Sequence, residues 1–159
     1  MKVISIFGGT GFIGTELVTQ LAKMPFKIQL FTRNKKRLDQ LRLGPRIELI
    51  EFSMKKNFTT KLNGSDVIIN LVGILHEGRR IKFSKVHEEF VENLINFALK
   101  KNIKRIIHIS ALGVSSNSVS KYLLSKYNGE VIIQDKFKMY DWTILRPSIV
   151  FGPHDKFIN

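Results

Sequence analysis

The sequence predicts one α/β domain, residues 1–159, built on a doubly wound parallel sheet of about six strands with helices on both faces. Two observations support this class. Short apolar runs alternate with helix-period segments along the whole chain, which is the pattern of successive strand–helix–strand units. The apolar runs are nearly continuous, as expected of strands that helices cover on both sides.

The strands are predicted in chain order from these apolar runs. The first run, Lys2 to Phe7, begins almost at the N-terminus and leads directly into a glycine-rich turn. The later runs are separated by segments long enough to hold a helix, so each pair of strands can be joined by a crossover. The six predicted strands are residues 2–7, 27–32, 47–52, 66–72, 104–110 and 142–146.

The helices are predicted from apolar spacing and from residues that end helices. In the first, Ile13, Leu17 and Leu21 recur at four-residue spacing, and Pro25 follows its end. The second is short and basic, and the third is long, with an apolar face formed by Val86, Phe90, Leu94 and Ala98. The fourth follows a serine-rich loop. The predicted helices are residues 12–24, 34–43, 83–101 and 120–137.

Composition limits the kind of protein. At 159 residues, with 43% hydrophobic and 25% charged residues, the chain falls in the range of a single, ordered globular domain. There are no cysteines, which excludes disulfides and thiolate metal sites and is typical of a reducing cytoplasm. The four histidines have no metal-ligand spacing, so no metal site is predicted. They are His76, His87, His108 and His154.

The charge balance favours acidic partners. Lys and Arg number 26 against 13 acidic residues, a net charge of +13. Such a balance suits nucleic acid, anionic lipid or phosphorylated ligands. The basic runs, Asn34–Arg37 and Lys100–Lys101, are short and contain no interleaved aromatic residues, so specific nucleic-acid recognition is not predicted. A solvated, lysine-rich surface stays an equal alternative to docking on an anionic membrane or an acidic protein.

Targeting and membrane segments are not expected. The strand-like run from Lys2 leaves no room for a signal or transit peptide before it. The longest apolar stretch, Val67 to Leu75, is nine residues long and includes Asn70 and Gly73. A membrane span needs roughly 18 residues. The expected location is therefore the bacterial cytoplasm, either free or peripheral on the inner face of the plasma membrane.

The turn after the first strand predicts a dinucleotide site. A strand that runs into Gly8-x-x-Gly11-x-x-Gly14 and then into a helix places backbone amides and a helix N-terminus beside a pyrophosphate. Gly8 makes the tight turn, Gly11 admits the ligand, and Gly14 lets the helix approach the strand. The cofactor-binding residues predicted here are Gly8, Thr10, Gly11, Phe12, Ile13 and Gly14.

The end of the second strand favours NADP(H) over NAD(H). An NAD-binding domain usually presents an acidic residue to the ribose hydroxyls at this position, about 20 residues past the turn. This sequence has Arg33, followed by Lys35, Lys36 and Arg37. A guanidinium can hold a 2′-phosphate through two hydrogen bonds, whereas a carboxylate would repel it. The alternative interpretation of these cations is the solvated start of a basic helix.

Tyr122 and Lys126 form a candidate catalytic pair. They lie four residues apart and thus on one face of the predicted fourth helix. With the glycine spacing, this Tyr-x-x-x-Lys pattern resembles the short-chain dehydrogenase/reductase superfamily, a group of Rossmann-type proteins, in its extended and atypical forms. The resemblance implies that the Tyr passes a proton to or from a carbonyl or alcohol. It also implies that the Lys lowers the pKa of the Tyr and bonds the nicotinamide ribose.

Further site residues are expected at the ends of the fourth and fifth strands. Ser110 can orient a substrate carbonyl, but if the superfamily's active-site Ser or Thr aligns with Ala111, Ser110 is an ordinary strand-end hydroxyl. Both alignments stay open. The superfamily places adenosine and ribose beside the segment that holds Asn70, Val72 and Gly73, so these are predicted cofactor contacts. His87 occupies a position where extended members commonly have Asn, and a buried hydrogen-bonding role is expected for it.

The closing segment narrows the resemblance. Leu145–Asn159, together with Asn70–Leu75, His108–Gly113 and Ser120–Tyr122, resembles the NADPH-binding accessory subunits of respiratory complex I and their bacterial homologues. That family implies nicotinamide contacts at Pro147, Ser148 and Ile149, a structural cofactor, and complex I subunits as partners. Its members continue into a substrate-like domain, which is expected to be absent here. The alternative is an active oxidoreductase or nucleotide-sugar epimerase/dehydratase that uses Tyr122 and Lys126.

Overall fold

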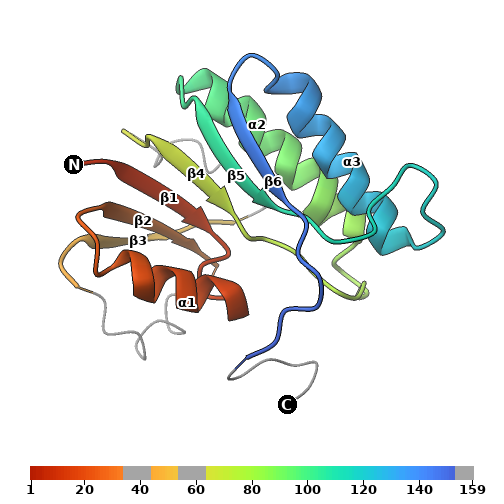
Figure 1. Ribbon diagram of the computed structural model, residues 1–159, viewed down its shortest axis with the longest axis horizontal. Helices are drawn as coiled ribbons and strands as arrows, with labels where there is room; N and C mark the ends of the chain where they lie inside the picture. Colours follow the sequence, from red (N-terminus) through yellow and green to blue (C-terminus); the bar gives the residue numbers. More distant parts are fainter. Residues whose placement is uncertain (34–43, 54–63, 153–159) are drawn as a thin grey trace.

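The computed structural model describes residues 1–33, 44–53 and 64–152. They form a six-stranded, wholly parallel sheet in the order β3-β2-β1-β4-β5-β6, with helices on both faces, which confirms the predicted fold class (Figure 1). The strands are β1 (Val3–Phe7), β2 (Lys27–Thr32), β3 (Ile47–Glu51), β4 (Val67–Asn70), β5 (Arg105–Ile109) and β6 (Asp141–Leu145).

The direction of winding reverses at the middle of the sheet. β1 pairs with β2 on one side and with β4 on the other, so that Phe7 is in register with both Phe31 and Asn70. The connections from β1 and from β4 therefore leave the sheet in opposite directions. In open α/β sheets, ligands bind in the crevice beyond the carboxyl ends of two such strands.

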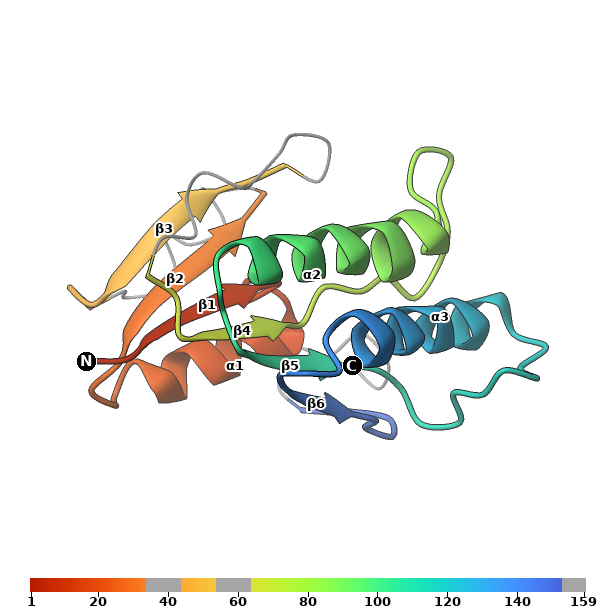
Figure 2. The same cartoon turned by 90° about the horizontal axis from the view of Figure 1, so that it is seen from above.

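Helix α1 (Phe12–Leu21) covers one face of the sheet (Figures 1 and 2). Leu17 and Leu21 pack against the strands, as the four-residue spacing predicted, but the fully buried residue between them is Val18, which that spacing did not include. The strand residues of this core layer are Ile4, Ile6, Ile28, Leu30 and Ile69. The layer holds the start of α1 next to the end of β1.

Helices α2 (Phe90–Lys100) and α3 (Lys121–Lys136) cover the other face (Figure 2). Their core centres on stacked aromatic rings: the Phe7 and Phe31 ring centroids lie 4.3 Å apart, and Phe52 and Phe90 meet Phe7 edge-on. The apolar face predicted for the third helix is confirmed, because its four residues are all buried. They are Val86, Phe90, Leu94 and Ala98.

The long helix does not begin as a regular α-helix. Its first part, η3 (Ser84–Glu89), is a π-helical segment that runs directly into α2. The π-helix is rare and occurs mostly as single turns inside α-helices, often at functional sites. Val86 and His87 are the buried residues of this segment.

Two predicted boundaries differ from the structure for local reasons. The fourth strand was predicted over residues 66–72 but ends at Asn70. The reason is that Oδ1 of Asn70 accepts a hydrogen bond from the Val72 amide at 3.1 Å, which turns the chain out of the sheet. Helix α1 ends at Leu21 rather than Met24, because tight turns before Pro25 replace its last α-helical turn. The helix predicted over residues 34–43 lies outside the described residues.

The described residues carry neither a membrane-spanning helix nor a cluster of metal ligands. Within them, no helix combines the length and the apolar character that a membrane crossing requires. In the same part of the chain, His, Asp and Glu side chains form no group of three that could hold a metal ion.

Candidate functional site

The turn between β1 and α1 is built on glycines that the backbone requires. Gly8 has a φ of +81°, and a Cβ there would lie 2.8 Å from the Leu71 carbonyl carbon. A Cβ on Gly14 would lie 2.4 Å from the Gly8 carbonyl oxygen. Side chains at either position would therefore push the turn away from β4 or the helix away from the turn.

The first turn of α1 offers backbone donors to a ligand. Gly11 is the N-cap residue, in an extended conformation, and no side chain caps the helix. The Gly11 amide donates to the Gly8 carbonyl at 3.0 Å, which fixes the loop. The following amides, from Phe12 and Ile13 onward, lie at the positive end of the helix dipole. A glycine-lined loop with such donors fits an anionic diphosphate.

Arg33 directly follows β2 and is exposed. Because β2 is parallel to β1 and pairs with it, Arg33 leaves the sheet at the same edge as the glycine turn. Arg33 is thus positioned at the edge where the second strand of such folds meets the ribose. The neighbouring basic residues 35–37 lie outside the described residues.

Asn70, at the end of β4, uses its side chain inside the protein. Its Oδ1 accepts the Val72 amide at 3.1 Å, and its Nδ2 lies 3.0 Å from Nδ1 of His108. Since the amide nitrogen can only donate, Nδ1 of His108 accepts, and Nε2 carries the ring proton. Asn70 thus shapes the β4 loop, whereas Gly73 beyond it is exposed.

His87 joins the β4 loop to α3. Its Nε2 accepts the Ile74 amide at 3.1 Å, and its Nδ1 lies 2.8 Å from the Ser125 hydroxyl. The ring is therefore neutral, with its proton on Nδ1. Burial, with a further contribution from the charge of Lys126, lowers the pKa of His87 to about 3. The expected buried, hydrogen-bonding role of His87 is confirmed.

Lys126 is buried beneath the same loop. Its Nζ donates to the Ile109 carbonyl at 2.8 Å, and a Cβ built on Gly73 would lie 3.5 Å from that nitrogen. Burial lowers the pKa of Lys126 to about 8, although Glu130 one turn later opposes the shift. The ammonium is therefore desolvated and lies where the β4 loop meets β5.

Tyr122 lies one turn before Lys126 on α3 and is half-buried. Its ring meets Phe83 and His87 edge-on, with centroids 5.7 and 5.6 Å away. Burial raises the pKa of the Tyr122 phenol. In this environment the phenol is protonated at neutral pH and can donate a hydrogen bond.

Ser110 follows β5 and is buried. Its hydroxyl has no hydrogen-bond partner among the described residues, and the same is true of Nε2 of His108. The adjacent Ala111 is half-buried. The two alignments that the sequence left open for the active-site hydroxyl therefore remain two alternatives.

The chain after β6 crosses the carboxyl edge of the sheet toward the start of α1 (Figure 1). Arg146 is held by the buried carboxylate of Glu130, with Nε 3.0 Å from Oε1. The Leu112 amide donates to the Pro147 carbonyl at 2.9 Å, and Gly152 lies against the ring of Phe12. Ser148 and Ile149 of this segment are exposed.

The predicted site residues gather at one edge of the sheet. Contacts connect the glycine turn to the β4 loop, the β4 loop to Lys126, and the segment after β6 to α1. The sequence did not identify Ser125, Gly129 or Glu130 as part of this assembly. One signal was available, because a glycine inside a helix often marks close backbone approach. A Cβ on Gly129 would lie 2.3 Å from the His87 carbonyl oxygen.

The reversal between β1 and β4, with a glycine turn and an uncapped helix at its carboxyl edge, defines a nucleotide-binding α/β protein of the Rossmann type. The family comparison agrees. The NAD(P)H-binding family model matches residues 8–153, and the chain belongs to this family.

Individual relatives include respiratory proteins. The chain is 32% identical to the rat mitochondrial NADH dehydrogenase [ubiquinone] 1 alpha subcomplex subunit 9, over 99% of this chain and 43% of that protein. It is 28% identical to the 40 kDa subunit of the Neurospora crassa NADH-ubiquinone oxidoreductase, over 98% of this chain and 42% of that protein. The chain thus spans less than half the length of these relatives.

A solved structure shows the same fold. The UDP-glucuronic acid 4-epimerase from Bacillus cereus, in complex with NAD, superimposes with a TM-score of 0.81 at 22% sequence identity. The match covers 98% of this chain and 59% of the epimerase.

Proposed function

We propose that the chain binds NADP(H) in preference to NAD(H), and that it holds this cofactor as a structural element of an accessory subunit related to respiratory complex I. The observation that carries the proposal is the turn at Gly8, Gly11 and Gly14, where glycines and uncapped amides fit a diphosphate. The mitochondrial relatives support the respiratory assignment. Its partners would be complex I subunits, at the cytoplasmic face of a bacterial membrane.

The described residues suggest how the cofactor would be held. The glycine turn would bind the diphosphate through the amides of Phe12 and Ile13, while Gly8, Gly11 and Gly14 leave room for it, since the Gly11 amide already donates to the Gly8 carbonyl. Thr10 flanks this turn, and Arg33 would bind the 2′-phosphate. At the other end, Lys126 would bond the nicotinamide ribose. The remaining contacts would be made by Val72, Gly73, Pro147, Ser148 and Ile149, whereas Asn70, which is buried, would act only by shaping the loop that presents Val72 and Gly73. The bound cofactor would supply hydride chemistry, which a structural role does not use.

A nucleotide titration tests the cofactor preference. Calorimetry with NADPH and NADH should show tighter binding of NADPH, and Arg33→Glu should weaken NADPH much more than NADH, because it replaces attraction for the 2′-phosphate by repulsion. Lys100→Glu, an exposed substitution at the end of α2, is the matched control and should change neither. Equal weakening of both nucleotides by Arg33→Glu would remove the basis for the preference.

A second candidate is an active oxidoreductase or nucleotide-sugar epimerase/dehydratase. The observation that favours it is a desolvated Lys126 with a pKa lowered to about 8, one turn from Tyr122. In this role Tyr122 would exchange a proton with a carbonyl or alcohol, and Ser110 would orient the substrate. An active-site hydroxyl at Ser110 would have to turn out of the buried position it has in the structure.

Turnover and assembly separate the two candidates. If the cofactor is structural, the full protein loaded with NADPH should leave its redox state unchanged against carbonyl and nucleotide-sugar panels. Tyr122→Phe should then have no effect in cells. Substrate-dependent oxidation that disappears in Tyr122→Phe would establish the enzyme instead. The subunit proposal fails if affinity purification from the native cells recovers no complex I component.

A further inference from the structure

The connection between β4 and η3 projects from the carboxyl edge of the sheet as a defined loop (Figure 2). We call residues 75–82 the basic loop. The Gly78 amide donates to the Ile81 carbonyl at 2.9 Å, which closes the tip of the loop. At its base, Glu77 Oε1 accepts the Phe83 amide at 3.0 Å. These two bonds give the basic loop a fixed shape despite its exposure.

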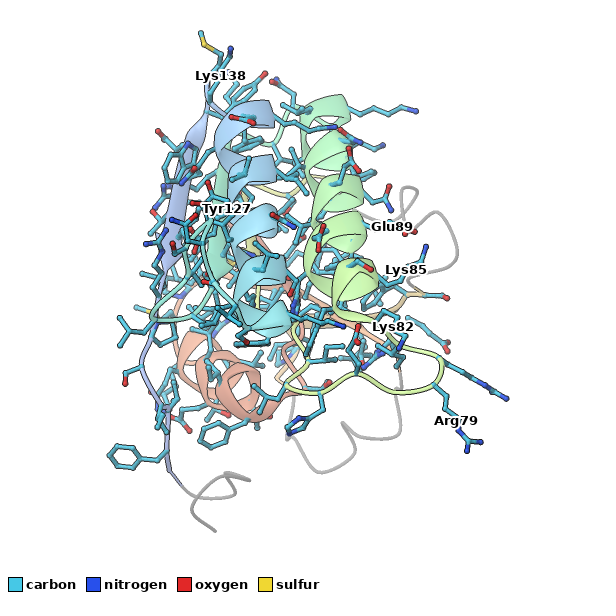
Figure 3. All side chains as sticks on the ribbon, turned by 90° about the vertical axis from the view of Figure 1, so that its right-hand side faces the viewer. Arg79, Lys82, Lys85, Glu89, Tyr127 and Lys138 are labelled. Carbon is cyan, nitrogen blue, oxygen red and sulfur yellow. The ribbon has the colours of Figure 1, made fainter. Side chains whose placement is uncertain are left out.

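The charges of the basic loop are arranged with the cations outermost. Glu77, its one acidic residue, is used at the base, where it also lies 3.7 Å from Lys82. Arg79 and Arg80 are exposed and form no ion pair or hydrogen bond with any residue that the structure describes. Arg79 points away from both helices, Lys82 lies at the end of the basic loop, and Lys85 lies on η3 (Figure 3).

Apolar side chains accompany these cations. Leu75, before the two arginines in the sequence, is 66% exposed, and Ile81, directly after them, is 39% exposed. Protein interfaces are enriched in Arg, and their centres are apolar, so this combination suits a protein surface. A guanidinium also matches a carboxylate through two parallel hydrogen bonds. A membrane-binding loop would be expected to carry Trp or Tyr at its tip, and this loop contains neither.

We propose that the basic loop is a docking surface for an acidic protein partner, with Arg79 and Arg80 as its main contacts. This inference rests on the proposed function, because an accessory subunit requires a protein partner. It adds the place where the partner binds, residues 75–82, and the chemistry that the partner presents, which is carboxylate side chains with apolar side chains beside them.

The first experiment uses the purified full chain and a synthetic peptide of ten glutamates. The peptide should bind wild type, and its binding should weaken about tenfold in Arg79→Glu/Arg80→Glu, as expected when two contact charges are reversed. The matched control is Lys100→Glu/Lys104→Glu, which changes the net charge equally at the opposite edge of the sheet. The control should weaken binding far less. Equal weakening by both variants would overturn the proposal, because it would show binding by net charge alone.

The second experiment measures recovery of complex I subunits with the tagged protein from native cells. Arg79→Glu/Arg80→Glu should lose the association and keep its NADPH affinity, whereas Lys100→Glu/Lys104→Glu should keep both. If wild type associates and the loop variant does so equally well, the docking proposal falls and the proposed function stands. If wild type never associates, the proposed function falls, and the peptide experiment decides the docking proposal alone. The docking proposal would also be overturned if the loop were required for binding to phosphatidylserine vesicles and the peptide did not bind. That result would make the loop a membrane-binding surface.

Discussion

His108 lies in β5 with its whole ring inside the protein. Nδ1 accepts a hydrogen bond from Asn70, and no described residue accepts the proton on Nε2. Burial, with a further contribution from the charge of Lys126, lowers its pKa to about 3. The folded protein therefore keeps His108 neutral at pH values where the unfolded chain, with a pKa near 6.5, binds a proton.

This difference predicts a loss of stability in mild acid. Because the pKa of His108 is lower in the folded state, its contribution is complete above pH 6.5 and is lost as pH falls toward 3. Between pH 6.5 and pH 5 the loss is up to about 2 kcal/mol for this group. Urea unfolding followed by the fluorescence of Trp142 at several pH values measures it.

The matched variant is His108→Gln, whose side-chain oxygen can still accept the Asn70 amide. Its free energy of unfolding should depend less steeply on pH between 6.5 and 5 than that of wild type. A ring titration of His108 near pH 6.5, observed by NMR in the folded protein, would contradict the prediction.

At the residue scale, the sequence predicted those site residues that are recognised by their spacing along the chain. The glycine turn, Tyr122 and Lys126 could be found because their spacing is itself the signal. The pairing of Asn70 with His108 could not be found, since the two residues are 38 positions apart and meet only through the register of β4 and β5.

At the scale of the elements, the packing of α3 on η3 depends on Gly129. A Cβ at this position would lie 2.3 Å from the His87 carbonyl oxygen, an atom of the backbone that cannot turn aside. This close approach lets Ser125, one turn earlier, reach the ring of His87. The helix–helix contact therefore positions His87, whose hydrogen bonds to Ser125 and to the Ile74 amide join α3 to the β4 loop.

We expect Gly129→Ala to destabilise the protein by roughly 1–3 kcal/mol, because the helices must separate. An exposed Gly→Ala change in a helix would instead stabilise it, by about 1 kcal/mol. Urea unfolding therefore tests the contact by the sign of the change in the free energy of unfolding: a decrease shows a close contact, and an increase shows none. Gly44→Ala, where a Cβ meets nothing within 4 Å, is the control and should be nearly neutral. A stabilised Gly129→Ala would show that the contact is looser than described.

The elements themselves were predictable where their ends carry chemical signals. Ser120 caps α3 and accepts the Leu123 amide at 3.4 Å, close to the predicted start of that helix. The end of β4 was wrong by two residues because a side chain, Asn70, competes for the backbone amide there. The run Val67–Val72 does contain a signal, Asn70, because Asn side chains commonly accept a backbone amide two residues on, but the apolar pattern around it predicts a continuous strand.

At the scale of the whole molecule, bound nucleotide should stabilise the fold by mass action. A ligand at one hundred times its Kd adds about 2.7 kcal/mol, which raises the Tm by roughly 5–10 °C for a chain of this size. NADPH should give the larger rise and NADH the smaller at equal concentration, as calorimetric melting can show. Gly11→Val, which fills the space before the amides of α1, should abolish both rises.

The melting of Gly11→Val without nucleotide is the control that distinguishes lost binding from misfolding. Without nucleotide, Gly11→Val should still melt in one cooperative transition, at a somewhat lower Tm than wild type, since a Cβ at Gly11 would lie 3.2 Å from the Gly8 carbonyl oxygen and the turn must give slightly. If NADPH raises the Tm of wild type and of Gly11→Val equally, the nucleotide binds somewhere other than this turn.

The overall architecture could be predicted because each level of the sequence agrees with it. Continuous apolar strands, intervening helices and the glycine turn all specify a doubly wound sheet. The π-helical start of the long helix could not be predicted, because its residues follow the same apolar period as the α-helix after it. Val86, which lies inside η3, and Phe90, the first residue of α2, are four residues apart and both buried, as they would be in a regular α-helix.

The π-helical segment has an evolutionary consequence. A π-turn holds one more residue than the α-turn it replaces, so it is the expected trace of a single-codon insertion. Losing one codon between Ser84 and Glu89 would restore a regular helix and leave α2 in place, but it would rotate the preceding turn by about 100°. A lineage could in this way keep the fold and lose the hydrogen bonds of His87 to Ile74 and Ser125, so that length differences at this point would mark members that have changed function.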